Sequence, residues 1–319
     1  MSFRSNILRK INSLFKFKSK PFSIIKPNES EYIDMSKSKI IIYIIDIDKN
    51  LIDKKKNLLM IFDMDFTVLN ENSDYEIRDL LSKDDRELVA NSKDYKSWAD
   101  EVNAYFNRMK LRGVTIDDIK NRIQRIPLTD GFNEIFHTIR QIKLLKGIEE
   151  YKNTNLDVMF LSGANVKYVN WVLEKHSITD IVDDYISFSC KDIDGKLVVG
   201  DYHSHSCKSC DKSLCKEKAI KDYIDNIVNT KYKDTKNFKY DKICYVGDGG
   251  NDYCAGIAIS DINVNYKNHL MVRKGFILHR MLYDHEGNPR PKSKVLKCEI
   301  SLWGDGYELS KQITKNFLI

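Results

Sequence analysis

Asp63 and Asp65 are the residues of this 319-residue chain whose types and spacing most clearly suggest chemistry. They directly follow the apolar run Leu58–Phe62, which predicts a buried central strand. Ligands of open α/β sheets bind at the carboxyl ends of the strands, so both carboxylates should face that crevice. Paired carboxylates suit a divalent cation such as Mg²⁺, which prefers oxygen ligands and often bridges them to phosphate. An acidic turn after a strand would give the same pattern, so other residues must decide between the two.

Transfer of a phosphoryl group to a protein carboxylate would use such a pair. Asp63 could attack phosphorus without the help of a base, because a carboxylate is ionised at neutral pH. Asp65 could protonate the leaving oxygen and later deprotonate the attacking water, provided that its surroundings raise its pKa. Since the nucleophile and the phosphate are both negative, cations must lie beside them.

Two further apolar runs end in small or acidic residues. Residues 156–161 lead into Ser162, which could offer a hydroxyl and a backbone N–H to phosphate oxygens. Residues 242–246 lead into Asp248, which could complete a Mg²⁺ site with the first aspartate, and Asp252 could support that site. The three runs therefore predict one site built from three strand ends.

The segments between these runs have helical periodicity. The order is β-α-β, which predicts an α/β fold with a parallel sheet flanked by helices. Residues 75 to about 150 look helical, and a helix that begins near Lys216 and Lys218 could supply the lysine that must approach the phosphate. Residues 39–47 predict an additional strand. The acidic turn at residues 303–306 follows no apolar strand, which predicts a surface turn.

Several strings in the chain resemble the four motifs of the haloacid dehalogenase superfamily of Mg²⁺-dependent phosphatases. These motifs are Asp63-x-Asp65-x-Thr67, Ser162, the downstream lysine and Gly-Asp248-x-x-x-Asp252. Longer strings are similar to the phosphoethanolamine/phosphocholine and pyridoxal phosphate phosphatase family, from about residue 57 to the C-terminus. They are Phe62-Asp-Met-Asp-Phe-Thr-Val-Leu-Asn-Glu-Asn-Ser-Asp74, Gly113-Val-Thr-Ile-Asp-Asp, Arg125-Ile-Pro-Leu, His205-Ser-Cys207-x-x-Cys210-x-x-x-x-Cys215-Lys216, Tyr245-Val-Gly-Asp-Gly-Gly-Asn-Asp-Tyr-Cys254 and Arg273-Lys-Gly-Phe-x-x-His279-Arg280.

This resemblance implies a Rossmann-like core domain at residues 57–74 and 131–319. A helical cap at residues 75–130 would close over the substrate and exclude water. The resemblance also implies that Asp63 is the nucleophile and Asp65 the general acid and base.

The resemblance further implies which residues bind phosphate and metal. The phosphate-binding residues would be Thr67, Ser162, Gly163 and Lys216. Lys216 is preferred to Lys218 because Ala219 and Ile220 follow it at helical spacing. The cofactor would be Mg²⁺, held by Asp63, the carbonyl group of Asp65 and Asp248, with Asp252 as a supporting member of the metal site.

The position after Ser162 bears on the substrate. Family members that act on phosphoethanolamine or phosphocholine carry an aspartate there, which helps to hold the cationic head group, whereas this chain has Gly163. Asp74, the other acidic residue associated with the head group, is present. One carboxylate fewer weakens the case for a cationic amino alcohol. Pyridoxal phosphate, thiamine monophosphate and pyrophosphate are therefore considered beside it.

The function expected from these residues is hydrolysis of a small phosphorylated metabolite by a Mg²⁺-dependent phosphatase through an aspartyl-phosphate. Two alternatives use the same scaffold: a binding protein without activity, and a phosphotransferase that passes the phosphoryl group to an acceptor other than water.

Cysteines and histidines gather just before the candidate lysine. His203, His205, Cys207, Cys210 and Cys215 include a Cys-x-x-Cys spacing that suits zinc. No second Cys-x-x-Cys or His-x-x-x-His pair accompanies it, so buried thiols remain the alternative. The chain has seven cysteines, an odd number that favours a reducing compartment over a disulfide framework.

The overall charge and the N-terminus bear on partners and location. The net charge of +6 comes from lysines spread through the chain, and outside the N-terminus the sequence lacks the basic stripe with aromatic neighbours of a nucleic-acid binder. No apolar run is long enough to span a membrane. Residues 1–56 form a basic N-terminal extension that is either disordered or a targeting segment. We expect a cytoplasmic protein, or an organellar one if the extension directs it; the oligomeric state is not indicated.

Overall fold

The computed structural model describes residues 56–318, apart from residues 93, 146–153, 236, 263, 265 and 266. The strand expected at residues 39–47 and nearly all of the N-terminal extension lie outside the described residues. Within them, no helix is both long enough and apolar enough to cross a membrane.

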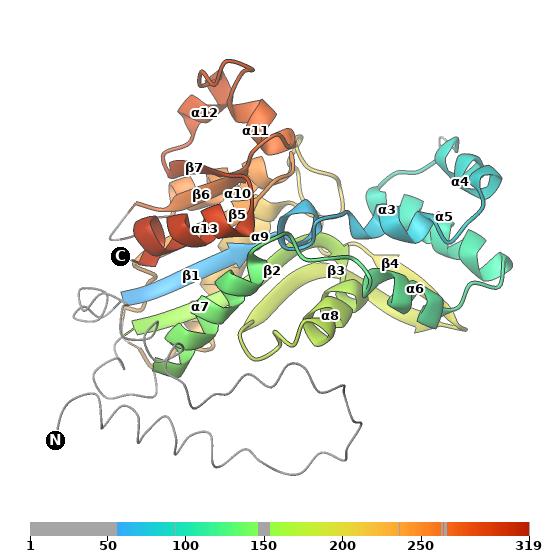
Figure 1. Ribbon diagram of the computed structural model, residues 1–319, viewed down its shortest axis with the longest axis horizontal. Helices are drawn as coiled ribbons and strands as arrows, with labels where there is room; N and C mark the ends of the chain where they lie inside the picture. The colour runs from blue at the N-terminus through green and yellow to red at the C-terminus, as the bar shows by residue number, and fades with distance from the viewer. Residues whose placement is uncertain are drawn as a thin grey trace, which may run out of the picture. The chain divides into compact units, whose positions relative to one another are not determined.

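A seven-stranded sheet forms the centre of the fold (Figure 1), with the strand order β4-β3-β2-β1-β5-β6-β7. Neighbouring strands are parallel except β4, which runs antiparallel to β3. The α/β fold with a mostly parallel sheet that the sequence predicts is therefore confirmed. The strands are β1 (Lys56–Phe62), β2 (Thr154–Asn165), β3 (Asp184–Ile193), β4 (Lys196–Gly200), β5 (Lys242–Gly247), β6 (His269–Arg273) and β7 (Glu299–Trp303).

The central strand β1 is covered on both faces, which is why its sequence is an almost unbroken apolar run. It pairs with β2 and β5, and Phe62 lies opposite Phe160 in β2 and Val246 in β5. This register brings the carboxyl ends of the three strands to the same edge of the sheet. The residues that follow each strand must therefore meet.

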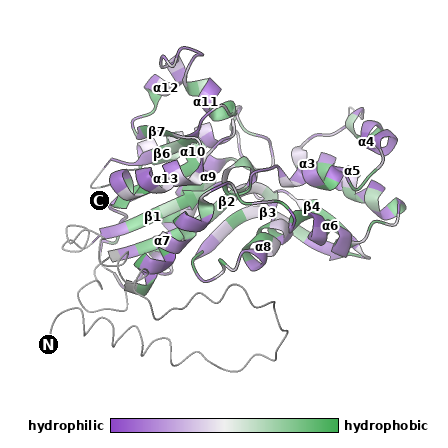
Figure 2. Cartoon of the chain, viewed as in Figure 1, coloured by the Kyte–Doolittle hydropathy of each residue, from purple (hydrophilic) through white to green (hydrophobic). Residues whose placement is uncertain are grey.

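Helices cover the two faces of the sheet. Helix α7 packs against α13 on one face, where α8 also lies, and α9 packs against α10 on the other (Figure 1). Figure 2 shows that β1 and β2 are largely hydrophobic, as expected for strands between two helical layers. The helices are α7 (Phe132–Leu145), α8 (Val166–Lys175), α9 (Lys216–Asn229), α10 (Asp252–Asp261), α11 (Ile277–Leu282), α12 (Pro291–Val295) and α13 (Gly306–Gln312), followed by the turn η4 (Ile313–Leu318).

Four helices lie between β1 and α7, after the turn η2 (Met64–Val68): α3 (Ser73–Arg78), α4 (Lys83–Ala90), α5 (Trp98–Leu111) and α6 (Ile116–Ile123). Each begins after a polar residue whose side chain accepts a hydrogen bond from a backbone N–H of the first turn. These residues are Asn72, Ser82, Ser97 and Thr115. Thr115 and Asp118 form a capping box, with aspartate in place of the usual glutamate.

A β-hairpin, β3–β4, packs against these helices and was not expected from the sequence. The side chain of Asn103 in α5 bonds both the N–H and the carbonyl of Val199 in β4, at 2.8 and 2.7 Å. The hairpin turns at Asp194 and Gly195, which both have positive φ. The segment above the carboxyl ends of the strands thus combines helices with a β-hairpin, rather than helices alone.

Residues 303–306 follow the short edge strand β7, which ends at Trp303 and was not predicted from the sequence. This edge strand is only partly buried and alternates polar with apolar residues, so it lacks the continuous apolar run of the other strands. The turn after it is also packed: a Cβ atom on Gly306 would lie 2.5 Å from the backbone nitrogen of Phe132. Only glycine allows α13 to approach α7 this closely.

Candidate active site

The ends of β1, β2 and β5 bring Asp63, Ser162 and Asp248 to one edge of the sheet. The N–H of Asp63 donates to the carbonyl of Val246 at 2.9 Å, so the first residue after β1 is still tied to β5. Asp63 and Asp248 are both buried, with 6% and 5% of their surface exposed. The convergence expected from the three apolar runs is present in the fold.

Lys216, the first residue of α9, lies fully buried against this group. Its Nζ is 2.8 Å from Oδ1 of Asp63 and 2.6 Å from Oδ1 of Asp252, and it donates to the hydroxyl of Tyr245 at 2.9 Å. Lys218 points to solvent instead and pairs with Asp222, one turn along the same helix. The structure therefore brings Lys216, and not Lys218, to the aspartates.

Asp252 organises the turn that carries Asp248. Its Oδ2 accepts hydrogen bonds from the backbone N–H groups of Asp248 and Gly249, at 2.9 and 2.7 Å. Its Oδ1 accepts from Lys216 and from the Tyr245 hydroxyl. Asp252 thus ties the end of β5 to the lysine.

Three carboxylates are crowded together at this point. One oxygen of each of Asp63, Asp248 and Asp252 lies within 4.8 Å of the others, and all three residues are buried. Burial raises the pKa of Asp63 to about 7 against the opposing charge of Lys216. Burial, reinforced by the charges of Asp63 and Asp252, raises the pKa of Asp248 to about 9. Negative charge in this group is therefore costly unless a cation joins it.

Thr67 has surroundings different from those expected. The resemblance implies that it binds phosphate, but its side chain is fully buried and its hydroxyl donates to Oδ1 of Asp248 at 3.2 Å. Thr67 does not line the cavity at the site. It is directed to a carboxylate, because the turn η2 carries it beneath the end of β5.

Asp65 turns away from the other carboxylates and toward the start of α3. Its two oxygens accept hydrogen bonds from the N–H and the hydroxyl of Ser73, both at 3.0 Å. Burial, followed by the charges of Asp74 and Asp63, raises the pKa of Asp65 to about 8. A carboxyl group with this pKa is largely protonated at neutral pH, which an acid requires.

A cavity of about 310 Å³ opens over these residues, a volume within the usual range for small-molecule sites. Its lining includes the predicted residues Asp63, Asp65, Asp74, Ser162, Gly163 and Asp248. It also includes Gly249 and Gly250, which lie in the string around Asp248. The remaining lining residues were missed by sequence reasoning: Phe66, Asn72, Tyr75, Trp98, Phe188, Asp211, Leu214, Asn251 and Ile277. Phe66, Asn72 and Asn251 lie inside the strings that resemble the family, which assigned no role to them. Most of the others lie in loops and in the helices above the sheet, where no periodicity marks a residue as part of a cavity.

Asp74 presents an unused hydrogen-bond acceptor at this cavity. Its Oδ2 accepts from the indole N–H of Trp98 at 2.7 Å, whereas its buried Oδ1 has no partner among the described residues. Burial raises the pKa of Asp74 to about 6. A buried acceptor without a partner is costly, and a bound ligand with a donor would satisfy it.

Gly163 leaves open space beside Ser162. A Cβ atom built on Gly163 would meet only the side-chain amide of Asn251, at 4.0 Å. The hydroxyl of Ser162 accepts a hydrogen bond from the N–H of Ala164, which leaves its own hydrogen available to a ligand. The structure thus admits a larger side chain at position 163.

The carboxylates at the ends of β1 and β5 belong to the motifs that resemble the haloacid dehalogenase type, and comparison with known proteins shows that the chain is a phosphatase, a phosphoric monoester hydrolase. The chain belongs to the family described as "Putative Phosphatase", which it matches over residues 58–317. The resemblance noted in the sequence is therefore confirmed.

The chain is similar to curated phosphatases over most of their length. Pyridoxal phosphate phosphatase of Mus musculus is 29% identical over 266 residues, which are 82% of this chain and 98% of the relative. Phosphoethanolamine/phosphocholine phosphatase of Gallus gallus is 27% identical, over 80% of this chain and 87% of the relative. A solved structure of phosphoserine phosphatase in apo form covers 82% of this chain and 99% of its own, with 20% identity and a TM-score of 0.45.

Proposed function

We propose that this protein hydrolyses a small phosphate monoester, with pyridoxal phosphate as the favoured substrate, through a phosphoryl group held covalently on Asp63. The observation that carries the proposal is the buried ammonium of Lys216 between the carboxylates of Asp63 and Asp252, at 2.8 and 2.6 Å. A lysine without exposed surface, placed on a nucleophile at a cavity, would neutralise charge on both the nucleophile and the incoming phosphate.

The donor set supports Mg²⁺ as the cofactor. Carboxylate oxygens are the ligands that this hard cation prefers, and three of them lie within 4.8 Å of one another. Asp63, Asp248 and the carbonyl of Asp65 would hold the ion, while Asp252, whose oxygens already accept four hydrogen bonds, would orient the site. When bound, Mg²⁺ would withdraw charge from the phosphoryl oxygens.

The two chemical steps would use the residues of the chain as follows. An oxygen of Asp63 bonds to phosphorus as the bond to the leaving alcohol breaks, and protonated Asp65 gives its proton to that alcohol. The resulting Asp65 carboxylate then takes a proton from water, which attacks phosphorus, releases inorganic phosphate and restores Asp63. Ser162 and the N–H of Gly163 would hold the phosphate oxygens.

The cavity wall supports the choice of substrate. Phe66, Tyr75, Trp98 and Phe188 offer aromatic surface to a flat ring, and the free oxygen of Asp74 can accept a hydrogen bond from a protonated ring nitrogen or a hydroxyl. The mouse relative named for pyridoxal phosphate agrees with this choice. A phosphorylated amino alcohol is the second candidate, since aromatic faces also attract an ammonium group.

Release of inorganic phosphate in the presence of Mg²⁺ tests the proposal. The substrates compared would be pyridoxal phosphate, thiamine monophosphate, phosphoethanolamine, phosphocholine and pyrophosphate, with kcat/KM highest for the first. Asp63→Asn keeps the shape of the nucleophile and should lower kcat by a factor on the order of 1,000 or more. Activity that persists in Asp63→Asn would refute the covalent step, and absence of turnover in the unaltered protein would favour a binding protein. Phosphate found on an acceptor other than water would identify a phosphotransferase.

A further inference from the structure

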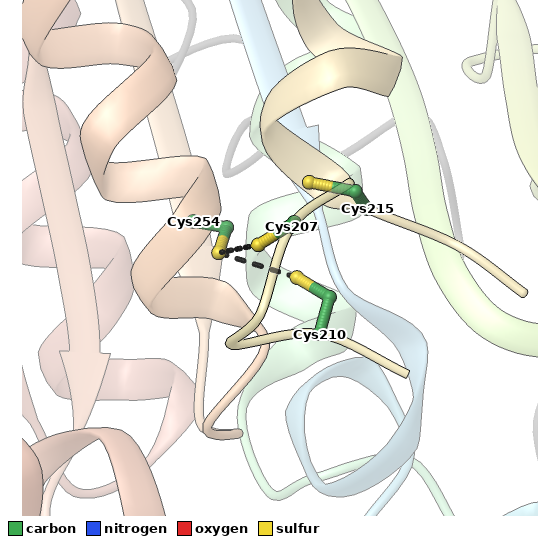
Figure 3. A group of neighbouring side chains, drawn as sticks. All are labelled: Cys207, Cys210, Cys215 and Cys254. Atoms are coloured by element: carbon green, nitrogen blue, oxygen red, sulfur yellow. Dashed lines mark hydrogen bonds between the residues drawn. The ribbon is translucent and has the colours of Figure 1, made fainter. Parts of the chain in front are cut away.

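Four cysteines from two separate elements meet beside the active site (Figure 3). Three come from the segment between β4 and α9, and Cys254 comes from the first turn of α10. All four sulfur atoms lie within 4.8 Å of one another. The Sγ of Cys254 is 3.7 Å from that of Cys207 and 3.2 Å from that of Cys210, and the fourth member is Cys215.

These separations suit a metal and not a disulfide. A tetrahedral zinc ion with Zn–S bonds of about 2.3 Å holds its sulfur ligands about 3.8 Å apart. A disulfide would bring two of them to about 2.0 Å, and all four thiols are free. We propose that Cys207, Cys210, Cys215 and Cys254 bind one structural Zn²⁺ ion.

The backbone around Cys207 supports this assignment. Cys207 and Cys210 have the Cys-x-x-Cys spacing of zinc-binding turns, and the N–H of Ser209 points at the sulfur of Cys207 at 3.4 Å. Such a bond stabilises a thiolate and orients it toward a metal. With four protein ligands the coordination shell is complete, so the ion has no open position for a substrate and its role is structural.

The two histidines of the same segment do not belong to the cluster. Nε2 of His203 accepts a hydrogen bond from the N–H of Cys215 at 3.1 Å, and Nε2 of His205 lies 2.7 Å from the carbonyl of Asp211. The histidines therefore support the loop, and the fourth ligand that the sequence cluster lacks is Cys254, from α10. A single Cys-x-x-Cys motif is sufficient because the fold supplies the missing partner.

The position of the cysteines indicates what the ion would do. Cys215 directly precedes Lys216, and Cys254 lies two residues after Asp252, so the metal would join the two elements whose side chains form the buried ion pair. Asp211 and Leu214 of the same segment line the cavity. Zinc would thus hold both the lysine and one wall of the active site in place.

The metal content of the purified full-length protein tests the proposal. After reduction and dialysis against buffer with Mg²⁺ but no chelator, mass spectrometry of the metals should find one zinc per chain. Cys207→Ser and Cys254→Ser should hold almost none. Cys298→Ser is the matched control: Cys298 is half-buried like Cys207 but lies outside the cluster, and this variant should keep its zinc.

A second set of measurements tests the proposal even where a cysteine variant fails to fold. In the unaltered protein, a thiol-specific mercurial should release the zinc in step with its reaction with four thiols. Reconstitution with Co²⁺ should give the absorption of a tetrahedral thiolate site, and Zn²⁺ but not Mg²⁺ should restore the Tm of the metal-free protein. Asp248→Asn should keep zinc, because the carboxylate site is separate.

Three results would overturn the proposal. Protein that contains no zinc and reacts with thiol reagents at all four cysteines has no such site. Zinc lost in Asp248→Asn but kept in Cys254→Ser belongs to the carboxylates. Iron in place of zinc, with its visible colour, would show a different metal centre.

Discussion

Replacing Lys216 by methionine is the change whose consequences the structure defines best. Methionine has nearly the shape of lysine but no charge, so the packing around α9 is kept while the ammonium between Asp63 and Asp252 is lost. Removing one partner of a buried ion pair costs about 3–5 kcal/mol, because the remaining charge is buried without compensation. We expect the free energy of unfolding of Lys216→Met to fall by about that amount at neutral pH, and phosphatase activity to be lost.

Lys218→Met is the matched control. Lys218 is two residues away on the same helix and also pairs with an aspartate, Asp222, but about half of each side chain is exposed. An exposed pair one helical turn apart contributes only about 0.3–0.5 kcal/mol. Urea denaturation of both variants without added Mg²⁺ should therefore separate a large loss from a negligible one.

The stability of Lys216→Met should also depend on pH in a definite direction. The pKa of Asp63 is already raised to about 7 by burial, and loss of the lysine charge raises it further. The folded state then holds protons that the unfolded state releases, so stability falls as pH rises through this range. The loss of stability in Lys216→Met should be smaller near pH about 5, where the Asp63 carboxyl is protonated, and largest near pH about 8.

A double variant decides whether charge is the cause. In Lys216→Met with Asp252→Asn, one unpaired carboxylate is gone, so the combined loss should be smaller than the sum of the two single losses by about 1–3 kcal/mol. Strict additivity, a loss that does not vary with pH, or equal losses for the two lysine variants would refute the electrostatic explanation.

Three further predictions concern the cavity and the packing beneath it. Burial is the main cause that raises the pKa of Asp65 to about 8, and the charge of Asp74 adds to it. Asp74→Asn removes that charge, so the fall of kcat at alkaline pH should begin at lower pH; a pH–rate profile that does not move would contradict this. Gly163→Asp fits the open space and should raise kcat/KM for phosphoethanolamine about tenfold relative to that for pyridoxal phosphate. The reason is that a carboxylate and an ammonium about 6 Å apart attract each other by on the order of 1–3 kcal/mol. An unchanged ratio would show that position 163 does not set the substrate preference. Gly306→Ala places a Cβ 2.5 Å from the backbone of α7 and should cost about 1–3 kcal/mol in urea denaturation, whereas Gly304→Ala, whose Cβ would meet nothing closer than 3.4 Å, should change stability little.

The strands that carry the site could be predicted from the sequence because of where they lie in the sheet. β1, β2 and β5 are central and covered on both faces, so each carries an apolar run before its polar end, interrupted only by Asp157 in β2. The preference for Lys216 over Lys218 has a similar basis. Ala219 and Ile220, one turn further along α9, are fully buried, and Lys216 shares their side of the helix.

Edge strands and long-range contacts could not be predicted in this way. β4 and β7 lie at the two edges of the sheet, where a strand keeps polar residues on its open side and loses the continuous apolar signal. Cys254 has no local feature that links it to Cys207, since the contact exists only because α9 and α10 pack side by side. Trp98 reaches the cavity through its hydrogen bond to Asp74, a pairing that no spacing in the sequence reveals.

The balance of charge at the active site supports the proposed Mg²⁺ ion although a lysine is present. Asp63, Asp248 and Asp252 carry three negative charges when ionised, and Lys216 is the one cation at ion-pair distance from them in the described part of the chain. Two negative charges are left over before any substrate binds. Burial raises the pKa values of Asp63 and Asp248, and the charge of Asp252 adds to the rise at both. A phosphate monoester adds about two more. In the proposed mechanism a divalent cation would first keep the nucleophile ionised and then admit the substrate. Mg²⁺ and phosphate ester should therefore each strengthen the binding of the other. Isothermal titration can measure this coupling in Asp63→Asn, which has one negative charge fewer and no turnover. In this variant Mg²⁺ should still tighten the binding of a phosphate ester, but by a smaller factor than in the unaltered site.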